Sequence, residues 1–335
     1  MKILVTGATG TIGEHLVNSL LEQKDVKVRI LARDPKKIPK TWKGKVETVI
    51  GDITNVDCIS ALVKNVDTVY HLAAIPEISE KFSEEEYFKV NSEITIELAL
   101  KCIEETVGKF VFFSSIEAVG GIEVAVKEKK PLNEKYQPEP TTLYGASKLK
   151  AERELLDLYQ KRDFPVSIVR PTVVYGPCMR GHFGPFKLIK ALDKGFFMFV
   201  GSGKNPVSWT YVKNVVDGAI LVANSKKSNG QIYTLSDDKP YPFKEIVTLV
   251  CKYLNRAVPK MHLSNAAAKI LRVPVEFAYG VLDKDPPLSK RKLMYLAGTY
   301  VFDTSKIRDE LGFSSKIGLE EGVRDTIRWY KDENL

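Results

Sequence analysis

Apolar and polar positions alternate in blocks along the first 170 residues. Short runs rich in β-branched residues, each bounded by turn residues, separate longer segments in which apolar residues recur at helical spacing. The strand-like runs cover residues 2–6, 26–31, 45–50, 67–72, 109–114 and 166–170. The helical segments lie near residues 12–24, 55–64, 84–106 and 142–162. Because the two kinds alternate, we expect right-handed βαβ units in a doubly wound parallel α/β sheet.

After residue 176 the pattern changes to short helices, isolated strands and loops rich in Pro and Gly. We expect residues 1–176 to form the sheet domain, with 207–235 partly returning to it. Residues 177–206 and 237–335 should form mainly a smaller, discontinuous substrate-binding lobe. The most apolar segment outside the strands, 264–282, is interrupted by charges, so it predicts a lid or an amphipathic helix and no transmembrane span.

The composition is that of an ordinary globular protein, with 44% apolar and 27% charged residues. Lys and Arg exceed Asp and Glu by 50 to 42, and the resulting net charge of +8 favours anionic ligands such as phosphates. No basic block is interleaved with aromatic residues in the way typical of nucleic-acid-binding proteins. We therefore expect a small-molecule partner and no nucleic acid.

The cysteines predict neither a metal site nor disulfides. They stand at positions 58, 102, 178 and 251, too far apart for a paired metal motif. The chain starts directly with the buried-type run MKILV, which leaves no room for a signal peptide. We expect a cytoplasmic protein whose Cys102 and Cys251 pack as small apolar residues.

A glycine-rich turn, TGATGTIG at residues 6–13, follows the first strand and opens the first helix. Its first glycine permits a tight turn, its second lets backbone amides approach a pyrophosphate, and its third lets helix and strand pack closely. The helix N-terminus adds a partial positive charge. The context predicts a dinucleotide site formed by Gly7, Gly10, Thr11, Ile12 and Gly13.

The end of the second strand predicts which dinucleotide is used. An acid here would hold the adenosine ribose hydroxyls of NAD. The sequence instead has Ala32 at this point and Arg33 next to it. A guanidinium can bind the 2′-phosphate of NADP and stack on adenine, so we favour NADP over NAD.

Catalytic side chains are indicated by YGASK at residues 144–148, within a strong helical pattern. Tyr144 and Lys148 are four residues apart and therefore share one helix face. A nearby ammonium and an oxidised nicotinamide both favour the phenolate, and Lys148 can also hold the nicotinamide ribose. Ser115 follows a parallel strand, at the edge where open α/β sheets bind ligands. Its hydroxyl can bind a substrate oxygen whose proton Tyr144 transfers.

Several motifs together resemble those of the extended short-chain dehydrogenase/reductases, the NAD-dependent epimerase/dehydratase superfamily with a Rossmann fold. They are TGATGTIG, GDI (51–53), HLAA (71–74), Asn91, SS (114–115), YGASK and RPTVVYGP (170–177), and the likeness runs nearly the whole chain. The resemblance implies further cofactor contacts at Asp52, Ile53, Leu72, Ala73, Ala74, Asn91, Ser114, Pro171 and Val173.

Within that superfamily, SSIEAVGG (114–121) and residues 286–313 are similar to 3β-hydroxysteroid dehydrogenase-like members. VRILARDP (28–35) is similar to the dihydroflavonol-reductase-like branch. Nucleotide-sugar enzymes usually carry an Arg-Asp-Tyr/Phe motif where this chain has Ser208 and Trp209, which lowers the expectation of a diphosphate-linked sugar.

Glu117 separates two chemistries. Sugar-nucleotide dehydratases carry an Asp-Glu pair here, and this chain has Ile116 before Glu117, so a single carboxylate remains. It suits substrate hydrogen bonding or an epimerase-like role better than a two-acid elimination, although pairing with a loop lysine explains it equally well. The candidate substrate-binding residues are Glu117, Met179, Phe183 and Trp209.

The leading hypothesis is an NAD(P)-dependent oxidoreductase that interconverts a secondary alcohol and a ketone. The alternatives are a nucleotide-sugar 4-epimerase or dehydratase with tightly bound NAD(P), and an NADP-sensing regulatory protein, which the intact Ser, Tyr and Lys set disfavours. Superfamily members commonly dimerise through two helices of each subunit. The resemblance therefore implies a homodimer formed by the helices at 84–106 and 142–162.

Overall fold

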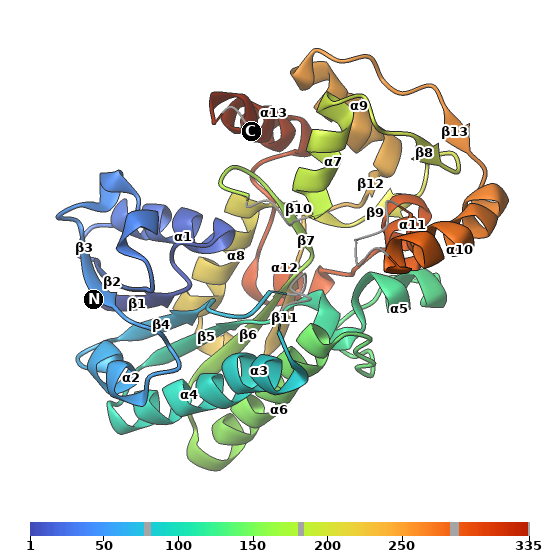
Figure 1. The fold of residues 1–335 in the computed structure, drawn as a ribbon. Coiled ribbons are helices and arrows are strands. Elements are labelled where there is room, and N and C mark those ends of the chain that lie inside the picture. Colours follow the sequence, from blue (N-terminus) through green and yellow to red (C-terminus); the bar gives the residue numbers. More distant parts are fainter. Residues whose placement is uncertain (77–81, 180–183, 282–287, 334–335) are drawn as a thin grey trace.

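Seven parallel strands form one sheet in the described part of the chain (Figure 1). The computed structural model describes residues 1–76, 82–179, 184–281 and 288–333. The strand order is β11-β6-β5-β4-β1-β2-β3. The chain order reverses between β1 and β4, and open sheets of this kind bind ligands beside such a switch point, outside the carboxyl ends of the strands. The predicted doubly wound Rossmann fold is confirmed.

The six predicted strands are all present, with ends that differ by at most one residue. The structure adds a seventh, because residues 232–235 pair with the last predicted strand at the sheet edge. The sheet consists of β1 (Lys2–Thr6), β2 (Lys27–Ala32), β3 (Val46–Ile50), β4 (Thr68–His71), β5 (Lys109–Phe113), β6 (Val166–Pro171) and β11 (Ile232–Leu235).

Helices cover both faces of the sheet (Figure 1). One face is covered by α1 (Thr11–Leu21) and α8 (Val212–Asn224). The opposite face is covered by α2 (Val56–Val63), α4 (Ile94–Glu104) and α6 (Leu143–Arg162). Each layer buries its apolar helix stripe against β-branched strand residues, so the sheet separates two hydrophobic cores.

The helix predicted over residues 84–106 is not regular. It consists of α3 (Glu84–Phe88), one π-helical turn, η3 (Lys89–Glu93), and α4. Ser83 begins α3 with a capping box: its hydroxyl accepts from the amide of Glu86, whose carboxylate accepts from the amide of Ser83. A π turn holds one extra residue, so the helix faces before and after it are offset.

Most of the chain after residue 176, apart from α8 and β11, gathers beyond the carboxyl end of β6 (Figure 1). Their helices are α7 (Gly184–Asp193), α9 (Phe243–Leu254), α10 (Asn265–Val281), α11 (Lys290–Ala297), α12 (Ser305–Leu311) and α13 (Leu319–Asp332). Their short strands are β8 (Phe199–Val200), β9 (Pro206–Val207), β10 (Trp209–Tyr211), β12 (Tyr241–Pro242) and β13 (His262–Leu263), while β7 (Val173–Tyr175) pairs with β10. Helix α5 (Gly121–Glu128) and turn η4 (Ile116–Val119) precede α6 and contact this lobe through α11.

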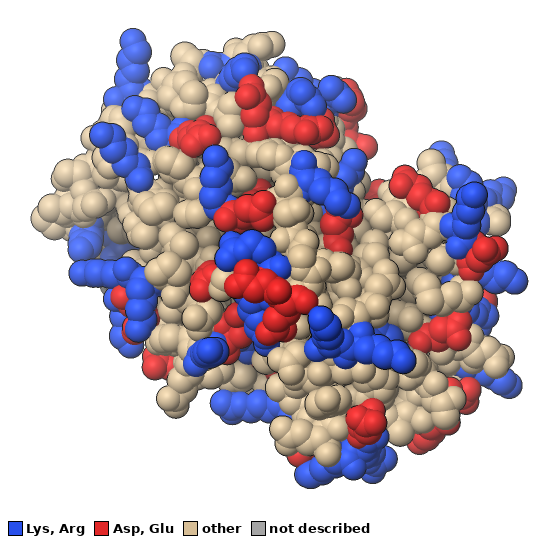
Figure 2. Space-filling view, turned by 180° about the vertical axis from the view of Figure 1, so that it is seen from behind, with Lys and Arg blue, Asp and Glu red and all other residues tan. Residues whose placement is uncertain are grey.

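The surface opposite to the view of Figure 1 mixes both signs of charge, with Lys and Arg interspersed among Asp and Glu (Figure 2). Across the described ranges, no helix combines the length and apolar character needed to cross a bilayer. Nor do three or more His, Cys, Asp or Glu side chains gather as a metal-binding group among the described residues.

Candidate active site

The glycine-rich turn folds tightly between β1 and α1. Gly7 has a φ of +69°, and a Cβ atom there would lie 2.7 Å from the backbone nitrogen of Ala73. A Cβ atom on Gly13 would lie 2.2 Å from the carbonyl oxygen of Gly7. The turn is therefore a cradle that only glycine leaves open, and Gly10 directly precedes the N-terminus of α1.

A buried series of side-chain hydrogen bonds links the start of this turn to β4 and α4. The Thr95 hydroxyl donates to the carbonyl oxygen of Asn91 at 3.0 Å, so its oxygen is left to accept from Nε2 of His71 at 2.9 Å. Nδ1 of His71 then accepts from the Thr6 hydroxyl at 2.7 Å. Burial lowers the pKa of His71 to about 3, so the ring is neutral and the series is fully paired.

The π turn holds Asn91 in a fully buried position. Its Oδ1 accepts from the amide of Ile75 at 2.8 Å, and its Nδ2 donates to the carbonyl of Ile75 at 3.1 Å and to the Ser147 hydroxyl at 3.1 Å. Asn91 thus fixes the backbone that follows β4 and joins it to α6.

The other residues expected to contact the cofactor follow the carboxyl ends of strands. Leu72, Ala73 and Ala74 follow β4, and the amide of Ala73 donates to the Thr6 hydroxyl at 3.3 Å. Asp52 and Ile53 follow β3, and Pro171 and Val173 lie at the junction of β6 and β7. The sheet topology therefore brings these separate segments to one edge.

Two serines follow β5. The Ser115 hydroxyl accepts from the amide of Glu117 at 3.2 Å and so caps η4, while its own hydrogen can still be donated. Ser114 is buried, and its hydroxyl has no hydrogen-bond partner in the described part of the chain. A buried hydroxyl without a partner fits a polar ligand group at this edge.

Tyr144 and Lys148 lie on the first turns of α6. Thr142 starts this helix, its hydroxyl accepting from the amide of Gly145 at 3.0 Å. A Cβ atom on Gly145 would lie 2.2 Å from the carbonyl oxygen of Glu117, so the glycine lets α6 approach η4 closely. The same helix start therefore brings Tyr144 to Ser115.

Burial governs the protonation of this pair. It raises the pKa of Tyr144 well above its ordinary value, the charge of Glu117 raises it further, and a hydrogen bond with Ser115 opposes the shift. Burial also lowers the pKa of Lys148 to about 7, although Glu152 opposes this. Nζ of Lys148 donates to the carbonyl of Phe113 at 2.9 Å and lies 5.9 Å from the centre of the Tyr144 ring. The protein's own groups therefore keep Tyr144 protonated at neutral pH.

Glu117 belongs to η4 and is buried beside α11. Burial raises its pKa to about 7, a hydrogen bond from the amide of Ile122 opposes the shift, and the charge of Glu123 adds to it. A guanidinium nitrogen of Arg291 lies 3.7 Å from its carboxylate. The partner is thus an arginine of the smaller lobe, where the sequence suggested a loop lysine.

Arg33 follows β2 and is highly exposed. Its guanidinium lies 3.9 Å from the carboxylate of Asp52, which also accepts from the amide and hydroxyl of Thr54, both at 2.9 Å. The side chain is therefore free of the core and stands at the strand end that the NADP hypothesis requires.

The candidate substrate residues differ in their surroundings. Met179 and Trp209 are each 2% exposed, and the Trp209 indole donates to the Tyr300 hydroxyl at 3.1 Å. Core packing accounts for both. Ser208 is also buried, and its hydroxyl accepts from the amide of Phe302. Phe183 lies outside the described residues.

Sequence reasoning missed three contributors to the site. His71 was part of the HLAA motif, yet its role depends on threonines from two other elements. Arg291 lies far along the chain in the irregular lobe. Ser147 pairs with Asn91. Sequence signals existed for His71, within HLAA, and for Ser147, within YGASK on the same helix as Tyr144, but none existed for Arg291.

The glycine cradle, the unpartnered Ser114 hydroxyl and the strand-end contacts together fit a dinucleotide. When bound, a nicotinamide dinucleotide would supply hydride transfer to or from a carbon of the substrate. Gly7, Gly10 and Gly13 would hold its pyrophosphate, and Lys148 would reach its ribose.

Comparison with known proteins agrees with this geometry. The model of the NAD dependent epimerase/dehydratase family matches residues 3–236. The chain is 28% identical to the sterol-4-alpha-carboxylate 3-dehydrogenase, decarboxylating, of Mus musculus, over 98% of this chain and 90% of that protein. It is 29% identical to the UDP-glucose 4-epimerase of Vibrio cholerae, over 99% of this chain and 96% of that protein.

A solved structure has the same fold. The UDP-glucuronic acid 4-epimerase of Bacillus cereus, in complex with NAD, superposes with a TM-score of 0.78 at 23% identity and full coverage of both chains. The relatives therefore include both dehydrogenases and epimerases, at nearly equal identity.

Proposed function

The chain belongs to the NAD-dependent epimerase/dehydratase family of extended short-chain dehydrogenase/reductases, and we propose that it interconverts a secondary alcohol and a ketone with net hydride transfer. The observation that carries this proposal is the meeting of Ser115, Tyr144 and Lys148. The junction of β5 with η4 supplies Ser115 and the start of α6 supplies Tyr144 and Lys148, so these groups meet at the carboxyl edge of the sheet, beside the glycine cradle.

Each residue has one role in the proposed reaction. Ser115 donates a hydrogen bond to the substrate oxygen. Tyr144, held protonated by burial, gives its proton to that oxygen during ketone reduction and takes it back during alcohol oxidation. Lys148 lies below the phenol ring and, when charged, stabilises the phenolate.

A net redox reaction is favoured over nucleotide-sugar epimerisation by residues 208 and 209. At the position where nucleotide-sugar enzymes usually carry an arginine, Ser208 and Trp209 are buried and paired within the core. They offer no charge to a diphosphate. Glu117, with Ile116 before it, also lacks the second acid of a dehydratase, and we propose that it binds a substrate hydroxyl.

The proposal is tested by nicotinamide absorbance with hydroxysteroids, other secondary alcohols and UDP-sugars as substrates. Tyr144→Phe should lower kcat by about 10²- to 10⁴-fold, because it removes only the transferable proton. Tyr136→Phe, a partly exposed tyrosine outside the site, is the matched control and should keep full activity. Full turnover by Tyr144→Phe would exclude the assigned role.

We further propose NADP as the preferred cofactor, since Arg33 stands where a 2′-phosphate would bind. Arg33→Ala should lower kcat/KM for NADP by about 10- to 100-fold, the value of a charge-assisted hydrogen bond, and leave the NAD reaction nearly unchanged. The control is Lys45→Ala. Lys45 is an exposed cation just before β3, and so it lies at the opposite edge of the sheet from Arg33. Equal losses of kcat/KM with NADP and with NAD would show that Arg33 acts through packing and not through contact with a 2′-phosphate.

The division into a sheet domain and a smaller substrate lobe, with residues 207–235 partly returning to the sheet, is part of this proposal.

We also propose a homodimer formed by the helices at 84–106 and 142–162. Phe88, Pro140 and Leu149 line a hollow between α3 and α6 that fits such an interface. Light scattering should give twice the chain mass, and a monomer at micromolar concentration would contradict it.

A nucleotide-sugar 4-epimerase is the second candidate, supported by the similarity to the Vibrio cholerae epimerase. An epimerase returns the hydride to the same substrate. It would therefore retain bound cofactor through dialysis and invert a UDP-sugar without net change in nicotinamide absorbance. The substrate panel separates the two candidates directly.

A further inference from the structure

The surface of the smaller lobe carries exposed apolar side chains close to basic ones. Six large apolar residues, each at least 37% exposed, lie on the loop after α7, on the loop before β13 and on α10; they are Phe196, Met198, Met261, Ile270, Leu271 and Val273. We call these residues, with the Lys and Arg of segments 187–204 and 255–276, the apolar-basic face.

The three segments form one continuous surface. Strand β8 pairs with β13, so residues 196–200 run beside 261–263, and α10 begins directly after them. The amide of Phe199 donates to the carbonyl of Met261 at 3.1 Å. The two loops are also joined by the ion pair of Arg256 with Asp193 at 3.2 Å. Figure 1 draws β8, β13 and α10 together at the edge of the lobe.

Helix α10 turns apolar residues outward. A surface helix normally buries its apolar stripe and exposes polar residues. Here Ile270 is 73% exposed and Val273 59% exposed, one turn apart, while Ala268 is fully buried. The outward stripe therefore lacks a covering partner within the described residues.

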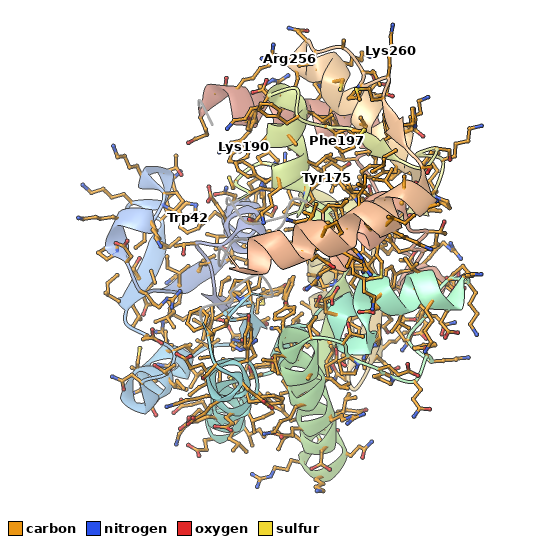
Figure 3. The ribbon with its side chains drawn as sticks, turned by 45° about the vertical axis from the view of Figure 1, so that its right-hand side comes forward. Trp42, Tyr175, Lys190, Phe197, Arg256 and Lys260 are labelled. Carbon is orange, nitrogen blue, oxygen red and sulfur yellow. The ribbon has the colours of Figure 1, made fainter. Side chains whose placement is uncertain are left out.

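Cations outnumber acids in the segments that carry this face. Segments 187–204 and 255–276 together hold eight Lys and Arg against two acids, a net of +6 within a chain of net +8. Both acids are ion-paired with arginines of the same face, Asp193 with Arg256 and Glu276 with Arg272. Figure 3 shows Arg256 and Lys260 at the outer rim of the lobe, whereas the face in Figure 2 mixes both signs.

We propose that the apolar-basic face docks the protein on the surface of an anionic lipid bilayer. Exposed aliphatic and aromatic side chains enter the boundary between headgroups and acyl chains, while lysines contact anionic headgroups, a combination typical of interfacial amphipathic helices. Protein interfaces are instead depleted in lysine, which makes a protein partner the poorer match. The docking is peripheral and independent of which substrate the active site takes.

The test is flotation of the full-length protein with vesicles of phosphatidylcholine alone or mixed with phosphatidylglycerol, at low and high salt. We expect binding to the anionic vesicles that weakens as salt rises. The double variant Ile270→Ser with Val273→Ser should lower the partition coefficient by about tenfold or more. Lys260→Glu with Lys269→Glu should lower it similarly at low salt.

Ile50→Ser and Lys43→Glu are the matched controls, because both residues are exposed on the far edge of the sheet domain. Circular dichroism would verify that every variant folds. Absence of binding to anionic vesicles at low salt would overturn the proposal. Vesicle binding that the Ile270 and Val273 substitutions leave unchanged would also overturn it. A third contrary outcome is a protein that never binds vesicles and whose self-association, measured by light scattering, these substitutions abolish.

Discussion

Replacing Glu117 by Gln tests the electrostatic account of the site most directly. The substitution keeps the shape of the side chain and removes its charge. Burial raises the pKa of Glu117 from its ordinary 4.5 to about 7 in the folded protein. That difference corresponds to about 3 kcal/mol by which folding disfavours the ionised carboxylate.

The sign of the pH dependence follows from proton binding. Between pH 4.5 and about 7 the folded chain keeps a proton on Glu117 that the unfolded chain has released. The contribution of Glu117 to the free energy of unfolding of the wild type therefore falls as pH rises through this window. Glu117→Gln has no proton to lose, so its stability relative to the wild type should rise by about 3 kcal/mol across the window.

Urea denaturation at a series of pH values, followed by circular dichroism, measures this difference. Glu139→Gln is the control, because the Glu139 side chain is 52% exposed and its ion pair with Lys127 lies at the surface. That variant should differ from the wild type by less than about 1 kcal/mol at every pH. A stability difference for Glu117→Gln that stays constant from pH 4.5 to 7 would refute the reasoning.

Turnover of the same variant separates the two roles of the carboxylate. If Glu117 moves a proton, Glu117→Gln should abolish turnover in a protein that is folded and at least as stable as the wild type. If it holds a substrate hydroxyl, the amide should keep most of kcat and raise KM.

Two further outcomes follow from the packing beneath the cofactor turn. In a fluorescence titration with the dinucleotide, Gly13→Ala should weaken affinity by about tenfold or more, since its Cβ atom would lie 2.2 Å from the Gly7 carbonyl oxygen. The control Gly318→Ala, whose new Cβ atom would meet open space, should bind the dinucleotide normally. His71→Leu leaves two buried threonine hydroxyls without their ring partner and should lower the free energy of unfolding by about 2 to 5 kcal/mol in urea denaturation. A loss below about 1 kcal/mol would show that the series of hydrogen bonds through His71 is not needed.

Much of the sheet domain was predictable from the sequence, because buried parallel strands need unbroken apolar runs and βαβ units allow few topologies. The edge rule of open α/β sheets then places Ser115 beside the glycine cradle without any distance being known. Tyr144 and Lys148 required only helical spacing.

The remaining features depend on contacts that no local pattern records. The π turn around Asn91 changes the helical period by one residue, too little to interrupt the apolar pattern. Arg291 meets Glu117 only because α11 packs against α5. The sequence predicted that residues 207–235 partly return to the sheet domain, but it did not identify residues 232–235 as the strand that pairs with β6. Burial, invisible in the sequence, raises the pKa of Tyr144 and so opposes the phenolate that a charged Lys148 and an oxidised nicotinamide would favour.

The segment after β7 is tied to the sheet domain on the α1 side. Helix α1 holds it at two carbonyls: the Thr11 hydroxyl donates to Cys178 at 3.1 Å and Nε2 of His15 donates to Pro177 at 3.2 Å. On the other side, the lobe is fastened by the surface ion pair of Lys290 with Glu123. Because the Lys290–Glu123 pair lies at the surface, higher ionic strength should weaken this contact and leave the two hydrogen bonds on the α1 side in place.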